Sequence, residues 1–61
     1  MKEFYLNCTA DYRIIDENGE EYTVAEAKNM WETFDLDCNL AFARLVENNF
    51  DLDATKAYYE G

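Results

Sequence analysis

The sequence predicts a single α+β domain over residues 1–61, in which an N-terminal β-hairpin, residues 1–23, is followed by a compact three-helix bundle, residues 24–61. Three observations predict this fold class. Apolar and polar residues alternate near the N-terminus, which is typical of a half-buried strand. A capping box at the end of the predicted hairpin marks the start of a helix. Two asparagines, a phenylalanine and an aspartate at residues 48–51 separate two segments with helical periodicity.

The first strand follows from the alternation, which places one consistently apolar set on the same face: Phe4, Leu6, Cys8, Ala10, Tyr12 and Ile14. The return strand is expected from Glu20 to Val24. A three-residue loop at 17–19 would pair Ile14 with Tyr22 and gather the apolar residues on one face, whereas a two-residue loop would turn Tyr22 to the polar face. We therefore expect the longer loop, with Gly19 at a positive φ.

The two predicted strands differ in length. The alternation covers about 11 residues, and the return strand can pair with only about half of them. Residues 3–9 would then have an unpaired edge, which proteins normally pair, cover or protect by charge. The sequence favours either a homodimer through residues 3–9 or the addition of a partner's strand. The alternative is a bend near residues 7–10 that folds the first half onto the helices or back along the sheet.

The first helix is predicted from Val24 to Thr33, because Thr23 and Glu26 can cap its first turn reciprocally. The second helix is expected to have Asp35 or Asp37 as its N-cap. Its apolar stripe has the spacing of one helix face and comprises Cys38, Ala41, Phe42, Leu45 and Val46.

The third helix is predicted to begin after Asp51, whose carboxylate can cap it, with Asp53 near the positive end of the helix dipole. Its inward line comprises Leu52, Thr55 and Tyr59. The inward lines of the first two helices and the turn at 48–51 predict a shared core of Trp31, Phe42, Leu45 and Phe50.

The charge of the chain restricts its partners. Fourteen acidic and five basic residues give a net charge of −9, and no Lys/Arg cluster is present to neutralise phosphates. The sequence therefore predicts no direct binding to nucleic acid or to an anionic membrane. The acidity is either a solvated outer face or the property of a small phage or mobile-element inhibitor that imitates DNA. No apolar run is long enough to span a bilayer, so a soluble cytoplasmic protein is expected.

Residue types argue against catalysis. The chain has no His and no Ser, so the familiar nucleophile–base triads cannot be assembled. Cys8 and Cys38 belong to no Cys-x-x-Cys motif and are expected to be buried thiols. Residues 35–39 match the first ligand positions of a calcium loop, but Leu40 and Val46 stand where that loop needs Gly and Glu. We expect no enzyme activity, no catalytic residue, no cofactor and no metal.

The stretch from Met30 to Tyr59 resembles a UBA-like three-helix domain, most of all the variant at the C-terminus of the mRNA-export receptor TAP. Residues 48–51 carry the resemblance, since that variant reads Asn-Asn-Trp-Asp where this chain has Asn-Asn-Phe-Asp. Asp37-Cys38 is similar to a pair on helix two of a UBA-like bacterial elongation-factor domain. The first inter-helix loop would fall on residues 34–36, without its glycine. The resemblance implies protein interaction rather than chemistry.

The predicted function is non-enzymatic binding of a protein or peptide through an apolar patch near the first helix–helix loop. Ubiquitin-binding members of the UBA-like family use the first loop and the end of helix three, which implies Phe34, Leu36 and Tyr58 here. The residues themselves add Leu40, which lies nearly opposite the apolar stripe of the second helix, and they also place Tyr58 off its core line. Apolar residues away from the core face mark binding patches. The alternative is that these residues pack beneath the hairpin.

Overall fold

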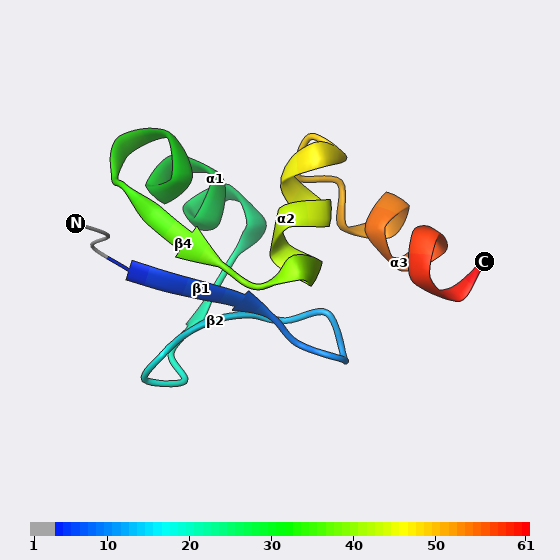
Figure 1. The fold of residues 1–61 in the computed structure, drawn as a ribbon, viewed down its shortest axis with the longest axis horizontal. Helices are drawn as coiled ribbons and strands as arrows, with labels where there is room; N and C mark the ends of the chain where they lie inside the picture. Colours follow the sequence, from blue (N-terminus) through cyan, green and yellow to red (C-terminus); the bar gives the residue numbers. More distant parts are fainter. Residues whose placement is uncertain (1–3) are drawn as a thin grey trace.

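The computed structural model describes residues 4–61, which form a four-stranded sheet and three helices (Figure 1). In chain order the elements are β1 (Phe4–Cys8), β2 (Ile14–Asp16), β3 (Glu21–Tyr22), α1 (Val24–Thr33), β4 (Leu36–Cys38), α2 (Leu40–Glu47) and α3 (Leu52–Glu60). The strand order is β3-β2-β1-β4. Strand β1 pairs antiparallel with β2 and parallel with β4, so the α+β class is confirmed but the sheet is mixed.

The predicted simple hairpin over residues 1–23 is wrong, because the chain turns between β1 and β2. The N–H of Thr9 donates to the carbonyl of Arg13 at 2.8 Å, and the N–H of Tyr12 donates to the carbonyl of Thr9 at 2.9 Å. Tyr12 has a φ of 63°. The alternation of apolar and polar residues does not reveal this turn, because residues in a turn can continue the alternation without lying in a strand. The alternative prediction placed a bend near residues 7–10, and the observed turn lies slightly later in the chain, at residues 9–13.

The turn between β2 and β3 has the predicted register. Ile14 lies opposite Tyr22, and the N–H of Asp16 donates to the carbonyl of Glu20 at 3.0 Å. Three residues therefore form the loop, and Gly19 has a φ of 83°. The predicted register is therefore confirmed. A Gly in the left-handed region allows the longer loop, and the longer loop keeps both apolar side chains on one face.

The carboxylate of Asp16 organises this turn, and the residue is only 7% exposed. Its Oδ1 accepts from the N–H groups of Asn18 and Glu20, at 2.8 and 3.0 Å, and its Oδ2 accepts from the Tyr22 hydroxyl at 2.7 Å. The Tyr22 hydrogen bond, followed by that of Glu20, lowers the pKa of Asp16 below its ordinary value of 3.8. The same carboxylate raises the pKa of Tyr22 to about 12.

Asp16 is expected to make stability depend on acid pH. Its folded pKa lies below its unfolded pKa, so its ionised form stabilises the fold above the unfolded value, and this contribution is lost as pH falls through the folded value. We expect Asp16→Asn to lower the melting temperature by several degrees at neutral pH. The difference from the wild type should shrink below pH 3.8 in thermal melts followed by circular dichroism.

The exposed carboxylate of Glu17, in the same loop, provides the matched control for this pH dependence. Glu17→Gln should leave the melting temperature nearly unchanged throughout the titration. A deficit of Asp16→Asn that stays constant into acid would mean that the amide disturbs the turn by its shape rather than by its missing charge.

Helix α1 begins and ends as predicted, and its capping box is formed. The N–H of Glu26 donates to Thr23 Oγ1 at 3.1 Å, and the N–H of Thr23 donates to Glu26 Oε1 at 2.8 Å. Ala27 is its fully buried residue. Reciprocal capping satisfies two donors at the helix start, which explains why local sequence sufficed to locate it.

The predicted start of the second helix is wrong. Residues 36–38 form β4, and α2 is capped by Asn39, so neither Asp35 nor Asp37 is its N-cap and Cys38 is not helical. Leu36 is buried at 6% exposure, and the Asp37 carboxylate accepts from the N–H of Cys38 at 2.9 Å. The free edge of β1 explains the difference, because pairing with it satisfies backbone groups that a longer helix would leave open. Strand β4 separates α1 from α2 in place of a short bundle loop.

Strand β1 is internal to the sheet. It pairs with β2 on one side and with β4 on the other. The unpaired edge on which the homodimer prediction rested is therefore absent from residues 4–8, and residue 3 lies outside the described residues. The sequence correctly identified a strand that needed a second neighbour, and the same chain supplies it from 32 residues further along, where Phe4 lies opposite Leu36.

The predicted aromatic core is confirmed. Phe42 and Leu45 are 0% exposed, and the Phe42 ring centroid lies 5.7 Å from that of Trp31 and 6.0 Å from that of Phe50, both of which are half-buried. The fully buried apolar residues come from the sheet, α1 and α2, and they comprise Leu6, Cys8, Ile14, Ala27, Leu36, Phe42 and Leu45. One core thus joins the sheet, α1 and α2.

The turn at residues 48–51 joins α2 to α3 as predicted. Asn49 and Phe50 have φ values of 58° and 61°, and the N–H of Phe50 donates to the carbonyl of Leu45 at 2.8 Å. Asp51 caps α3 by accepting from the N–H of Ala54 at 3.1 Å. The half-buried Phe50 side chain holds the turn against the core, which fixes how α3 leaves α2.

Candidate functional site

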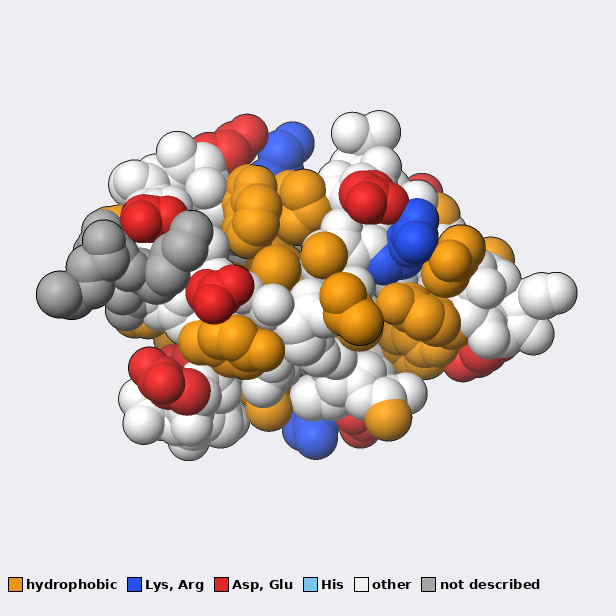
Figure 2. Space-filling model, viewed as in Figure 1, with side chains coloured by type: hydrophobic (Ala, Val, Ile, Leu, Met, Phe, Trp, Pro, Cys, Tyr) orange, Lys and Arg blue, Asp and Glu red, His pale blue; other side chains and the backbone are white. Residues whose placement is uncertain are grey.

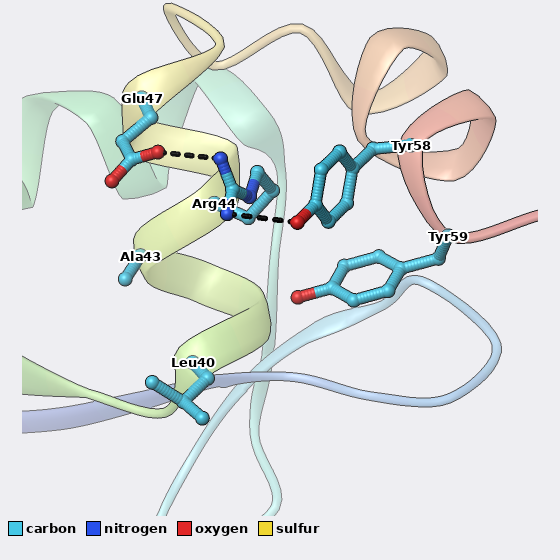
Figure 3. Close-up of a pocket in the computed structure, with 6 residues that line it drawn as sticks. All are labelled: Leu40, Ala43, Arg44, Glu47, Tyr58 and Tyr59. Carbon is cyan, nitrogen blue, oxygen red and sulfur yellow. Dashed lines mark hydrogen bonds and ion pairs between the residues drawn. The ribbon is translucent and has the colours of Figure 1, made fainter.

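An open groove of about 280 Å³ lies between α2 and α3 (Figure 3). Its lining comprises Leu40, Ala43, Arg44, Glu47, Tyr58 and Tyr59. The four residues from α2 have the spacing of a single helix face. This face is opposite the buried Phe42 and Leu45, so burial of one side of the amphipathic helix presents the other to the groove.

Arg44 bridges the two helices. Its Nη1 donates to Glu47 Oε2 at 2.7 Å, and its Nη2 donates to the Tyr58 hydroxyl at 3.1 Å. The guanidinium carbon also lies 4.0 Å from the centroid of the Tyr58 ring. A planar guanidinium can stack on an aromatic ring and donate at its edge at the same time. Contacts to both helices therefore hold the Arg44 guanidinium in place.

Two tyrosines form the α3 side of the groove. Tyr58 and Tyr59 are 57% and 48% exposed, and their ring centroids lie 5.0 Å apart at an interplanar angle of 87°. Both rings extend from α3 toward α2, with Tyr58 at the level of Arg44 and Tyr59 nearer the Leu40 end (Figure 3). Edge-to-face contact is a favoured aromatic geometry, so the pair forms a defined surface.

Leu40 is the most exposed large hydrophobic residue in the described part of the chain, at 86%. It occupies the first position of α2, directly after the Asn39 cap. In the space-filling view, hydrophobic side chains gather over α2 and α3 beside a cationic side chain (Figure 2). Exposed apolar side chains that cluster in this way mark interaction surfaces.

The structure brings only two of the four predicted binding residues together. Leu40 and Tyr58 line the α2–α3 groove, whereas a second hollow of about 290 Å³ is lined by Trp31, Phe34, Asp35 and Leu36. Helix α3 lies toward one end of the 35 Å long axis, and the junction between α1 and β4 lies toward the other end (Figure 1). The prediction that all four residues form one patch is therefore wrong.

The two residues predicted from the first inter-helix loop differ in accessibility, since Leu36 is buried and Phe34 is exposed. Leu36 is 6% exposed because β4 turns its side chain toward the core, so it is mainly a packing residue. Phe34 is 38% exposed and its ring packs edge-to-face on Phe4, with centroids 5.6 Å apart. A loop at residues 34–36 would have left the Leu36 side chain outside, and pairing of β4 with β1 buries it instead.

Sequence reasoning missed Arg44 and misplaced Tyr59. Arg44 lies one turn after Leu40, so a helical projection from Leu40 could have found it. Tyr59 is predicted on the inward line of the third helix, yet it is 48% exposed. That prediction is wrong because α3 extends past the core, and Thr55 is its only buried residue.

Thr55 and Tyr12 hold α3 in place. Thr55 is 0% exposed, donates to the carbonyl of Asp51 at 3.0 Å and accepts from Asn48 Nδ2 at 3.2 Å. The Lys56 ammonium lies 5.6 Å from the centroid of the Tyr12 ring, which reaches α3 from the turn between β1 and β2. Burial, and then the nearby Glu60 carboxylate, raise the pKa of the Tyr12 phenol. These contacts define the α3 wall of the groove.

The groove lining combines polar groups with aromatic surface. Its Arg, Glu and two Tyr side chains offer hydrogen bonds and aromatic surface, and the lining contains no thiol. Cys8 is 3% exposed, and burial, followed by the charge of Asp11, raises the pKa of its thiol, which disfavours the reactive thiolate. Within residues 4–61 no group of three His, Cys, Asp or Glu side chains is arranged to hold a metal ion. No helix in the same range has the length and apolar content needed to cross a membrane.

The size of the groove also limits what it can hold. Clefts that enclose small molecules have volumes of roughly 300–1,000 Å³. This groove has about 280 Å³, at the lower limit of that range, and it is open along the exposed Leu40 side chain. Comparison of the chain with protein-family models, curated proteins and solved structures finds no match.

Proposed function

We propose that this chain is a non-enzymatic protein-binding module that receives a polypeptide partner in the α2–α3 groove. One observation carries the proposal: an 86% exposed Leu40 shares a groove with an exposed tyrosine pair and an arginine already held by its neighbours. Tyr and Arg are enriched among the residues that dominate binding energy at protein interfaces. The arrangement combines apolar area with fixed polar groups.

The energetics favour a partner that covers Leu40 and the tyrosine rings together. Complete burial of an exposed Leu side chain is worth roughly 1.5–3 kcal/mol. Fixing a flexible side chain on binding costs about 0.5–1.5 kcal/mol. Contacts to Glu47 and Tyr58 already restrict Arg44, so a partner that packs on it avoids part of that cost.

The proposed kinship with UBA-like domains concerns the α2–α3 half of the chain. It rests on the turn at residues 48–51 and on the two helices that the turn joins. In the ubiquitin-binding members the first inter-helix loop takes part in the contact, whereas here the proposed contact comes from α2 and α3 alone. Ubiquitin itself is therefore not the partner that this proposal favours.

Capture of partners from a lysate of the source cell tests the proposal with two matched variants. Leu40→Ser removes the exposed apolar side chain without changing the charge, and Phe34→Ser does the same at the second hollow. We expect Leu40→Ser to lower the quantity of captured partner roughly tenfold or more, since loss of a buried Leu contact exceeds 1.4 kcal/mol. Phe34→Ser should retain capture.

The melting temperature of Leu40→Ser should stay within a few degrees of the wild type, because the side chain that it removes is 86% exposed. Capture that depends on Phe34 and not on Leu40 would move the binding site to the hollow between α1 and β4 and would contradict the proposal.

A further inference from the structure

We infer that the partner in the α2–α3 groove is a basic amphipathic helix, and this inference rests on the protein-binding function proposed above. The shape of the groove indicates a helix, and the charge of the chain indicates a basic one.

The two walls of the groove have the shape of a helix-binding site. The α2 wall runs from Leu40 to Glu47, which corresponds to about 10 Å of helix. Ala43 contributes only a methyl group between them, which keeps the groove open. The opposite wall is formed by Tyr58 and Tyr59 on α3. A helix of the partner can place an apolar ridge between two such walls, with anchoring side chains at positions i, i+3, i+4 and i+7.

A strand fits this place poorly. Among residues 4–61 the groove lining belongs to α2 and α3, so no sheet edge borders it. Strand addition uses the main-chain groups of an exposed edge. Edge strand β3 has two residues, and on the other edge strand, β4, the Asp37 carboxylate accepts from the N–H of Cys38. Short or covered edges of this kind discourage strand addition.

Arg44 is the cationic residue in the groove lining. The Glu47 carboxylate pairs with its guanidinium at 2.7 Å and balances its charge, so the groove has no net positive charge to attract an acidic partner. The Glu47 side chain remains 64% exposed and open to a second cation. The chain as a whole carries a net charge of −9. Its field therefore attracts a basic partner and opposes a second copy of itself, which has the same charge.

In the inferred complex the apolar face of the partner helix covers Leu40 and the Tyr59 ring. Lys or Arg residues on the flanks of that helix lie near Glu47, whose carboxylate is exposed. Each of these contacts uses a group that is at least partly exposed in the free chain.

Titration of the full ¹⁵N-labelled chain with three synthetic peptides of about 18 residues tests the inference. The first peptide has Leu at helical spacing and Lys elsewhere. The second has Glu in place of every Lys, and the third has the composition of the first in an order that forms no apolar face. We expect the first to shift amide signals of residues 40–47 and 55–61 and to bind roughly tenfold or more tightly than either control.

Two further measurements identify the contact. Leu40→Ser should weaken binding of the Leu/Lys peptide roughly tenfold, and Phe34→Ser should not change it. Raising the salt concentration from about 0.05 to about 0.5 M should weaken binding moderately without abolishing it, because salt screens the charges while the apolar contact persists.

Equal affinity for the Leu/Lys and Leu/Glu peptides would overturn the basic character of the partner. Equal affinity for the reordered peptide would overturn the helical apolar face and indicate general attraction of charge. If no peptide shifts the groove signals, the inference fails. Capture from a lysate that still depended on Leu40 would then leave the proposed function standing with a different kind of partner.

Discussion

Replacement of Phe42 by alanine is expected to destabilise the domain by about 3–5 kcal/mol. The side chain is 0% exposed and its ring contacts those of Trp31 and Phe50, so its removal leaves a cavity at the centre of the core. A domain of 61 residues has a total stability of roughly 3–9 kcal/mol. The variant should therefore lose at least about a third of the stability of the domain, as measured by urea denaturation followed by circular dichroism and Trp31 fluorescence.

Phe34→Ala is the matched control, because it makes the same chemical change at a side chain that is 38% exposed. Its ring has one close aromatic partner, Phe4, so the cost should be no more than about 1.5 kcal/mol. Similar destabilisation by both variants would mean that the core is not centred on Phe42.

The second large effect is expected at Asn39, which joins α2 to β1. Its Oδ1 accepts from the N–H groups of Phe42 and Cys8, at 2.9 and 3.1 Å, and its Nδ2 donates to the carbonyl of Cys8 at 3.1 Å. Asn39→Ala removes a helix cap, worth about 1 kcal/mol, and also the partners of two backbone groups in part-buried hydrogen bonds. We expect a total cost of about 2–4 kcal/mol in urea denaturation.

Asn39→Asp separates the two contributions. The carboxylate can still accept from both N–H groups but cannot donate to Cys8, so its stability should lie between those of the wild type and Asn39→Ala. Asn29→Ala, at an exposed position on α1, is the control and should be neutral or slightly stabilising, since Ala has the higher helix propensity. If Asn39→Ala costs no more than an ordinary cap, the bonds to Cys8 contribute nothing to stability.

Much of the fold could be predicted because its signals are local. Thr23 and Glu26 lie three residues apart and locate the start of α1. Asp51 locates α3, and Gly19 selects the register of β2 and β3. In each case the interacting groups are close in sequence, so residue types at fixed spacing contain the information. Exposure of Leu40 also followed from local periodicity.

The tertiary structure decided the remaining features. Residues 36–38 are too few to carry a strand signal of their own, and they become β4 because β1, 32 residues away at Phe4, offers an edge to pair with. That pairing buries Leu36 and places Phe34 away from the groove. The angle at which α3 leaves α2 sets Tyr58 over Arg44. The sequence by itself determined α1, the start of α3, the turn between β2 and β3, the turn between α2 and α3, and the exposed Leu40. Long-range backbone pairing and helix packing decided which side chains share a site, because both depend on contacts between residues far apart in the chain.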